Sequence, residues 1–252
     1  MSKLYAYNYP DKVVELENSI IYDSHITAYW CVSTEKAGYN VNTIISIMNN
    51  QDNYFDFSKN FIDIGARVGE FAVRLGTLFN HTYAFEPNKK SAALIHVNSL
   101  LANNIDKVDV INAYLSDCKK DVLYNGWCNA NDNNILANDI VDTVKTFHDG
   151  EHLDGKTYQL TTHTLDEYSF DNVGFIKIDV EGAEYEVLKG AIGTIMRNDC
   201  PPILFELLDD VCFKTTEIKE KYKNDLYSLL YSLGYSNIIQ YGEDSQNYLA
   251  LK

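Results

Sequence analysis

The chain has 252 residues, of which 46% are hydrophobic, so it can bury the core of one large α/β domain or two small ones. No stretch approaches the roughly 18 to 20 apolar residues of a membrane helix, and the first residues lack the apolar core of a signal peptide, so membrane insertion is not expected. The formal net charge of −15 disfavours a nucleic-acid partner, because an acidic surface is repelled by a phosphate backbone.

Residues 1–58 carry no clean hydrophobic period. We predict that they form an amino-terminal segment that packs against the sheet edge or covers the cofactor. An independent domain is not expected, since no Pro/Gly/Ser-rich linker separates them from the main domain at residues 59–252. Within this segment, residues 41–49 have the composition of a helix.

From residue 61 onward, predicted strands and helices alternate. Predicted strands cover residues 61–64, 82–87, 108–113, 175–180 and 203–207, and predicted helices cover residues 70–79, 88–103, 181–197 and 216–233. Strands that are separated by helices indicate a parallel sheet with crossover connections. Two last strands, at residues 236–241 and 247–251, are joined by a short polar turn and predict an antiparallel hairpin. The sequence therefore predicts an α/β fold with a seven-stranded, mostly parallel sheet.

The stretch of residues 121–163 has the least readable pattern. It contains the polar, turn-rich run GWCNANDNN at residues 126–134, which includes Trp127. The loop at residues 125–155 is either a lid that contacts the substrate or a surface insertion, and the sequence does not decide between them.

The five cysteines are far apart, odd in number and without a CxxC pair. They are Cys31, Cys118, Cys128, Cys200 and Cys212. This spacing predicts reduced thiols in a cytoplasmic protein and no structural zinc site.

The most informative stretch is FIDIGARVGEF at residues 61–71, a short apolar strand that ends in a glycine turn before a helix. Asp63 lies near the strand end, where a carboxylate is costly unless it holds something. Gly65 and Gly69 let the backbone turn tightly and leave room for a ligand. Strand, glycine turn and helix are the general format of a nucleotide-cofactor site in an open parallel sheet.

The residues around this turn distinguish between two cofactors. A dinucleotide site favours G-x-G-x-x-G, whereas Arg67 stands at the middle glycine position and Asp63 would repel a pyrophosphate. S-adenosylmethionine has no phosphate, and its ammonium and sulfonium groups suit an acid. Glu86 ends the next strand, where a carboxylate can bind both ribose hydroxyls of either cofactor. The pattern favours a methyltransferase, with a nicotinamide-dependent oxidoreductase as the alternative enzyme.

A more specific resemblance is carried by blocks that follow one another along the chain. They are FIDIGARVGEF (61–71), YAFEPN (83–88), Asn98, NAYLSD (112–117), HTLDEY (163–168), FIKIDVEGAEYEVLKGA (175–191), PPILFE (201–206) and NYLAL (247–251). These blocks resemble the FkbM family of S-adenosylmethionine-dependent methyltransferases, and IKIDVEGAE-x-x-VLKGA is the most diagnostic run. The resemblance implies the class I, Rossmann-like methyltransferase fold over roughly residues 60–252. Arg67 departs from the family, which usually has asparagine there.

The resemblance also implies roles for the matching residues. The implied cofactor contacts are Asp63, Gly65, Ala66 and Gly69 at the methionine end, Glu86 and Pro87 at the ribose, and Ala113 to Ser116 beside the adenine. It further implies O-methylation of a sugar or of a polyketide-type secondary metabolite. The expected acceptor is a sugar, either a small molecule, a nucleotide-linked sugar or a surface-glycan precursor.

The chemistry is expected at the ends of two later strands. Lys177 and Asp179 lie on one face of the strand at 175–180, and Glu206 ends the strand that follows. Because ligands of an open α/β sheet bind beyond the carboxyl ends of its strands, we expect these three charges to form the catalytic cluster.

Three interpretations of this cluster stay open. Asp179 or Glu206 accepts the substrate proton while Lys177 tunes the cluster. Alternatively, Asp179 and Glu206 bind Mg²⁺ or Mn²⁺, which lowers the pKa of the hydroxyl group and resembles the arrangement in catechol methyltransferases. The third interpretation is a buried ion pair between Lys177 and one acid that only holds two strands together. Glu181 and Glu184 are expected in the first turn of the next helix, where negative charge is favourable.

Two further alternatives concern other residues and the function as a whole. His163 is a candidate general base, but a histidine without a visible partner is more often structural. His148 and His152, in the loop at residues 125–155, are weaker candidates. Finally, the chain could be a protein that binds the cofactor and has lost turnover.

Overall fold

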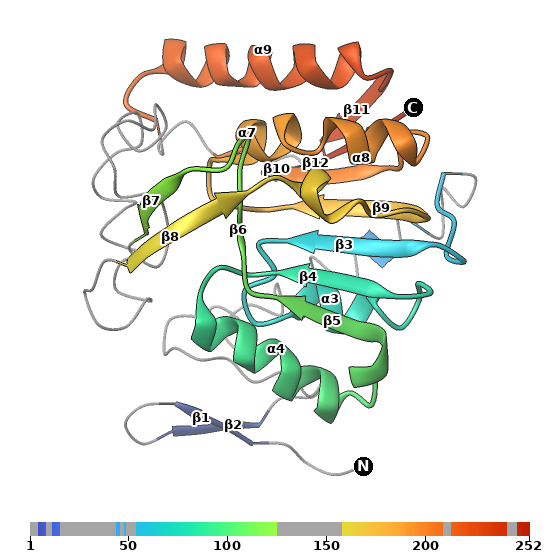
Figure 1. Cartoon of the computed structure of the whole chain (residues 1–252), viewed down its shortest axis with the longest axis vertical. Helices are drawn as coiled ribbons and strands as arrows, with labels where there is room; N and C mark the ends of the chain where they lie inside the picture. The colour runs from blue at the N-terminus through green and yellow to red at the C-terminus, as the bar shows by residue number, and fades with distance from the viewer. Residues whose placement is uncertain are drawn as a thin grey trace. The chain divides into compact units, whose positions relative to one another are not determined.

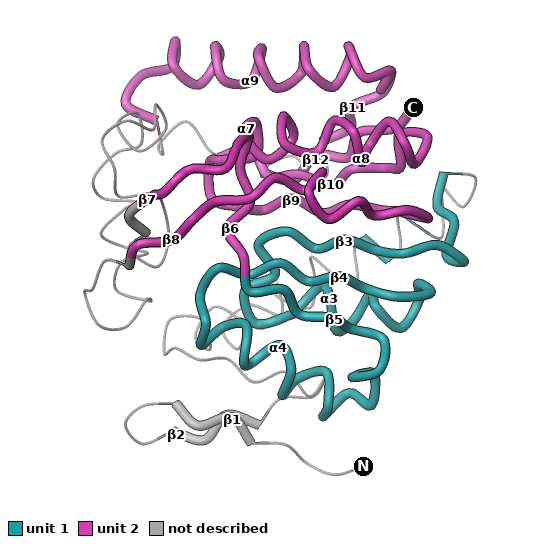
Figure 2. The backbone as a smooth tube through the Cα atoms, viewed as in Figure 1, with its two compact units in different colours: residues 1–112 teal, residues 113–252 magenta. Residues whose placement is uncertain are grey.

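The computed structural model describes residues 54–124, 158–208, 213–240 and 246–252, the strands at residues 5–8 and 12–15, and residues 44, 45 and 48. The chain divides into two compact units, residues 1–112 and 113–252 (Figure 2). Most of the predicted edge segment at residues 1–58 lies outside the described part, so its role stays a prediction.

The fold is α/β with a seven-stranded, mostly parallel sheet, which confirms the prediction from the alternating elements (Figure 1). The first unit contributes β3 (Asn60–Ile64), β4 (Thr82–Phe85) and β5 (Val108–Ile111), and the second contributes β9 (Val173–Ile178), β10 (Ile203–Glu206), β11 (Asn237–Gln240) and β12 (Asn247–Leu251). Within the first unit, β4 pairs in parallel with both β3 and β5. Within the second, β9 and β10 are parallel, whereas β12 runs antiparallel to β10 and β11. The predicted carboxyl-terminal hairpin is therefore confirmed.

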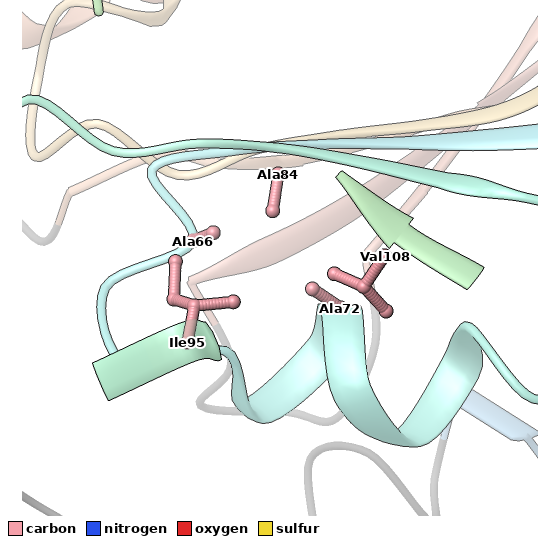
Figure 3. Close-up of a cluster of buried hydrophobic side chains, with 5 residues drawn as sticks. All are labelled: Ala66, Ala72, Ala84, Ile95 and Val108. Carbon is pink, nitrogen blue, oxygen red and sulfur yellow. The ribbon is translucent and has the colours of Figure 1, made fainter. Parts of the chain in front are cut away.

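The first unit buries small side chains between its strands and two helices, α3 (Glu70–Leu75) and α4 (Lys89–Leu101). The core cluster consists of Ala66, Ala72, Ala84, Ile95 and Val108 (Figure 3). Four of these five residues are alanine or valine, so helices and strands approach closely here. α3 ends four residues earlier than predicted, at Gly76, because glycine is a poor helix former.

The second unit contains a separate three-stranded sheet that the sequence did not predict. Its strands are β6 (Tyr114–Leu115), β7 (Asp121–Tyr124) and β8 (Tyr158–His163), with β8 in the centre. β8 is parallel to β6 and antiparallel to β7. β7 and β8 are separated by 33 residues that lie outside the described part, and short strands this far apart leave no local hairpin signal.

The single helix predicted at residues 181–197 is wrong. The structure has two short helices instead, α7 (Glu184–Lys189) and α8 (Ile192–Arg197), and α7 ends at Gly190. The chain does not enter α7 before residue 184 because Glu181 and Gly182 have positive φ angles of 58° and 99°. The later helix α9 (Thr216–Ser232) is as predicted, with Gly234 just beyond its end at a φ of 100°.

The amino-terminal segment is described only in part. β1 (Tyr5–Asn8) and β2 (Lys12–Glu15) form an antiparallel hairpin that was not predicted. Ile44, Ile45 and Met48 are helical, as expected within residues 41–49, and the remainder of that prediction lies outside the described residues. In the part of the chain that the structure describes, no helix combines the length and the apolar character needed to cross a membrane.

Candidate functional site

The glycine turn between β3 and α3 is held tightly by the backbone. The amides of Gly65 and Ala66 both donate to the carbonyl of Phe85, at 3.0 Å each. The φ angles of Gly65, Arg67 and Gly69 are 79°, 52° and 89°, all in the left-handed region. A Cβ atom on Gly69 would lie 3.0 Å from a side-chain carbon of α4. Glycine at residue 69 is therefore favoured by its left-handed conformation, and a Cβ there would also be tightly packed.

Glu86 ties this turn to the end of β4. Its Oε2 accepts from the amide of Arg67 and its Oε1 from the amide of Asn88, both at 2.8 Å. The carbonyls of Glu86 and Pro87 accept from Asn112 Nδ2 at 2.8 and 2.9 Å. Sequence reasoning did not foresee that Glu86 shapes the turn. A carboxylate oxygen can accept more than one hydrogen bond, so these two bonds do not by themselves rule out the predicted contact to ribose.

Asp63 and Asn98 are both fully buried beside the turn, each at 0% exposure. Asp63 lies in β3 in register with Ala84 of β4. Asn98 reaches from α4 and donates from Nδ2 to the carbonyl of Val68 at 2.7 Å, so it holds the glycine turn to α4. S-adenosylmethionine presents an ammonium group and two ribose hydroxyls, which are all donors. The two buried acids Asp63 and Glu86, which both lie beside the turn, fit that group.

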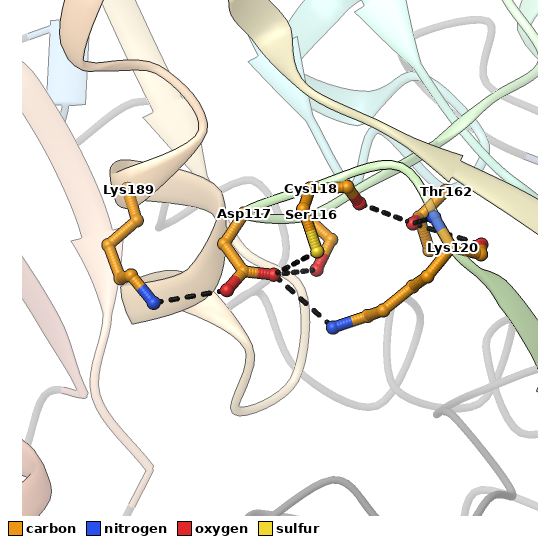
Figure 4. Close-up of polar contacts among 6 residues, drawn as sticks. All are labelled: Ser116, Asp117, Cys118, Lys120, Thr162 and Lys189. Atoms are coloured by element: carbon orange, nitrogen blue, oxygen red, sulfur yellow. Dashed lines mark hydrogen bonds and ion pairs between the residues drawn. The ribbon is translucent and has the colours of Figure 1, made fainter.

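Ser116, the predicted neighbour of the adenine, belongs to a hydrogen-bonded corner of the second unit (Figure 4). Its amide donates to the carbonyl of His163 at 2.8 Å. A Cβ on Gly190 would lie 2.0 Å from the Ser116 carbonyl, so the end of α7 meets this segment backbone to backbone. Ala113, the other predicted adenine contact, lies in the chain after β5 and just before β6, and its side chain is half-buried.

Asp117 holds the same corner through two lysines, and sequence analysis did not single it out. Its carboxylate lies 3.0 Å from Lys189 Nζ and 3.2 Å from Lys120 Nζ (Figure 4). Partial burial disfavours the charged form, but the hydrogen bonds from Lys189 and Lys120 outweigh it and lower the pKa of Asp117. The lysine and glycine of the VLKGA run thus contact the Ser116–Asp117 segment directly.

The predicted cluster of charges at the ends of β9 and β10 is brought together. Lys177 faces Leu204 across the two strands, and Asp179 and Glu206 lie two residues further along each chain. Lys177 is 3% exposed, and its Nζ is 3.1 Å from Asp179 Oδ2. β9 ends at Ile178, so Asp179 is the first residue of the following loop. An ion pair between Lys177 and Asp179 is therefore present at the end of β9, and the three interpretations of the cluster all stay predictions.

Glu206 differs from Asp179 in its surroundings. Its Oε2 is buried and makes no hydrogen bond. Burial and the nearby negative charges of Asp179 and Glu181 raise the pKa of Glu206 well above its usual value. Carboxylate oxygens of Asp179, Glu181 and Glu206 lie within 4.8 Å of one another, a spacing at which they could share a cation. Glu181 was expected in a helix and lies instead in the loop, so its place in this cluster was missed.

Glu184 lies in the first turn of a helix, as predicted, and the structure gives it further contacts that were not predicted. It is the first residue of α7 and is 0% exposed. Its Oε1 accepts from the amides of Val180 and Gly182, and its Oε2 accepts from the Tyr222 hydroxyl. Burial, together with the negative charge of Asp179, raises the pKa of Glu184 to about 7, although the backbone hydrogen bonds act in the opposite direction.

Of the three histidines considered as candidates, the structure describes only His163. His163 has a partner after all, since its Nδ1 lies 2.8 Å from Glu167 Oε2, and both side chains are partly exposed. His148, His152 and Trp127 lie outside the described residues, as does the whole loop at 125–155.

Residues 63–236 match a family described as the methyltransferase FkbM domain. Similar solved structures include a methyltransferase FkbM from Methylobacillus flagellatus KT, at 18% identity and a TM-score of 0.48, over 79% of this chain and 44% of that one. Magnesium protoporphyrin IX methyltransferase from Synechocystis PCC 6803, with bound SAM, has 10% identity and a TM-score of 0.45, over 85% of this chain and 78% of that one. An rRNA methylase from Streptococcus thermophilus has 11% identity and a TM-score of 0.40, over 79% and 87%.

The FkbM structure is much longer than this chain, which spans 44% of its length. A comparison with curated proteins found no match. The family match, by contrast, covers more than half of the chain and includes the glycine turn, the strand-end charges and α9. The chain belongs to the FkbM family of S-adenosylmethionine-dependent methyltransferases.

Proposed function

We propose that this chain transfers a methyl group from S-adenosylmethionine to a hydroxyl group of a sugar. The observation that carries the proposal is the half-buried Asp179 carboxylate, held by Lys177 at 3.1 Å and placed beside Glu206. Methylation of a hydroxyl requires an acceptor for its proton, and a positioned carboxylate is one. That the acceptor is a sugar rests on family membership, and a secondary metabolite is the alternative.

The residues have separate tasks in this proposal. In the first unit, Asp63, Gly65, Ala66, Gly69, Glu86 and Pro87 would hold the cofactor, and Ala113 and Ser116 would lie beside its adenine. When bound, S-adenosylmethionine supplies an activated methyl group. Asp179 takes the proton of the acceptor hydroxyl as the oxygen gains the methyl group, and Lys177 holds the carboxylate in place. Burial raises the pKa of Glu206 well above its usual value, which favours the protonated form of this acid, and a protonated carboxyl group can donate a hydrogen bond.

The charge of the cluster indicates which kind of sugar acceptor the site would bind. The cluster contains three carboxyl groups, from Asp179, Glu181 and Glu206, and one ammonium group, that of Lys177, which contacts Asp179. Such a site would repel a diphosphate. Among sugar acceptors, we therefore favour a neutral sugar or glycan over a nucleotide-linked sugar.

Mass spectrometry of products from a panel of neutral and nucleotide-linked sugars tests this proposal. We expect methylated product from a neutral sugar, and Asp179→Asn should reduce kcat by roughly 10²- to 10⁴-fold, the usual contribution of a general base. Asp171→Asn is the control, because that exposed acid lies just before the start of β9. Equal rates in Asp179→Asn and wild type would show that Asp179 does not take the proton.

A second version of the mechanism uses a divalent cation. It is favoured by the three carboxylate oxygens within 4.8 Å of one another. In that version Asp179, Glu181 and Glu206 would hold Mg²⁺ or Mn²⁺, hard cations that prefer oxygen ligands. Activity that is lost on chelation and restored by Mg²⁺ or Mn²⁺ would support it, whereas full activity in the presence of a chelator would exclude it.

Thermal unfolding with added cofactors separates the remaining alternatives. A ligand that binds the folded chain raises its Tm, so S-adenosylmethionine should stabilise it and NAD should not. The reverse result would favour an oxidoreductase. Stabilisation by S-adenosylmethionine without product from any acceptor would favour a protein that binds the cofactor without turnover.

A further inference from the structure

Residues 179–183 join β9 to α7 and carry two of the three clustered acids. The loop has an unusual backbone, because Glu181 and Gly182 have φ angles of 58° and 99°. A positive φ is unfavourable for a residue with a side chain, and such residues persist only where their surroundings hold them. Something must therefore hold Glu181 in this conformation.

Glu184 provides that hold. Its Oε1 accepts hydrogen bonds from the amide of Val180 at 3.0 Å and from the amide of Gly182 at 3.2 Å. These two amides lie on either side of Glu181. One oxygen of the Glu184 carboxyl group thus accepts from both amides and closes the loop.

Tyr222 of α9 holds the other oxygen of the same carboxylate. Its hydroxyl donates to Glu184 Oε2 at 3.0 Å and accepts from the amide of Tyr185 at 3.2 Å. Tyr222 is itself 8% exposed, and its ring lies against those of Tyr185 and Phe213. Both oxygens of Glu184 are therefore fixed in the interior, with no freedom to reach a substrate.

We propose that Glu184 and Tyr222 are positioning residues for methyl transfer, which hold residues 179–183 so that Asp179 and Glu181 stay beside Glu206. This inference rests on the proposed function. Glu184 acts through the loop and not on the acceptor, so its loss should reduce turnover more than binding. Reaction rates are sensitive to such placement, since a shift of about 1 Å can cost roughly 10²-fold.

Amide hydrogen exchange of the whole chain tests the structural part. Glu184→Ala removes the acceptor of the Val180 and Gly182 amides, and we expect exchange of these amides to become at least about tenfold faster. Glu184→Gln retains one acceptor oxygen and should preserve most of the protection. Glu186→Ala is the matched control, because Glu186 lies on the same helix and its Oε2 makes no hydrogen bond.

Steady-state kinetics with a methylated acceptor tests the catalytic part. We expect Glu184→Ala to lower kcat by about 10- to 100-fold, with KM and the Kd for S-adenosylmethionine within about threefold of wild type. Glu184→Gln should restore kcat to within about fivefold. Tyr222→Phe removes only a hydroxyl group, and it should lower kcat by about three- to tenfold. This variant still tests the inference if Glu184→Ala does not fold.

Three results would overturn the inference. They are unchanged protection of Val180 and Gly182 in Glu184→Ala, an unchanged kcat in Tyr222→Phe with faster loop exchange, and equal losses in Glu184→Gln and Glu184→Ala. If the wild-type chain methylates no acceptor, the proposed function fails by itself, and the exchange comparison still decides whether Glu184 holds the loop.

Discussion

Glu184 is a buried acid that makes the stability of the folded chain depend on pH. Its pKa is raised from an ordinary 4.5 to about 7, mainly by burial. An acid with a raised pKa stabilises the folded state fully below pH 4.5, and that contribution is lost as the pH rises to about 7. Above pH 7 the buried Glu184 side chain is mostly ionised, and this buried charge lowers the free energy of unfolding.

Glu184→Gln should accordingly be more stable than the wild-type chain at pH 8. Glutamine cannot ionise, so the difference in unfolding free energy between the two should grow by up to about 3 kcal/mol from pH 4.5 to pH 8. Urea denaturation of both proteins across this range measures it. A difference that does not change with pH would mean that Glu184 keeps an ordinary pKa in the folded chain.

At the scale of elements, the glycine turn between β3 and α3 depends on both backbone conformation and packing. Gly69 has a φ of 89°, and a Cβ there would lie 3.0 Å from Ile95 Cγ2 and 3.1 Å from Val73 Cγ2. Gly234, after α9, has a φ of 100° but nothing within 4 Å of the same position. A comparison of the two glycines therefore distinguishes the cost of the left-handed backbone, which both share, from the cost of steric overlap, which only Gly69 has.

Gly69→Ala should be more destabilising than Gly234→Ala. Each substitution costs about 1 to 2 kcal/mol for the left-handed conformation, and Gly69→Ala adds roughly 1 to 3 kcal/mol of overpacking. Tm measurements with and without S-adenosylmethionine check this, and only Gly69→Ala should weaken the stabilisation by the cofactor. Equal losses of Tm would show that Ile95 and Val73 move aside at no cost.

Elements were predicted well where the hydrophobic pattern is regular. β3, β4, β9, β10 and the terminal hairpin follow their apolar runs closely. The 181–197 helix was wrong because Glu181 and Gly182 have positive φ angles, and the amides of Val180 and Gly182 donate to the Glu184 carboxyl group. β6, β7 and β8 were missed because they pair over long sequence separations, which local periodicity does not record.

At the scale of the whole molecule, the charge predicts which partners are avoided. With 36 acidic and 21 basic residues, the chain is predicted not to bind RNA. In about 0.15 M salt, we expect no retardation of a single-stranded RNA at protein concentrations up to about 10 μM, because few cations are available to displace counterions. A retarded band, or transfer of labelled methyl groups to RNA, would contradict this prediction.

The sequence by itself determined the fold class, the family and the place of the glycine turn, because these follow from the order of apolar runs and from short motifs whose residues are neighbours in the chain. It also indicated that Lys177, Asp179 and Glu206 would meet, since strand alternation and parallel pairing are regular. Only the tertiary structure decided how these groups are held. Glu86 binds the amide of Arg67, and Glu184 binds a loop and the hydroxyl of Tyr222. Such contacts join residues up to 38 positions apart, and burial, which sets the pKa of Glu184 and Glu206, is a property of the packed molecule.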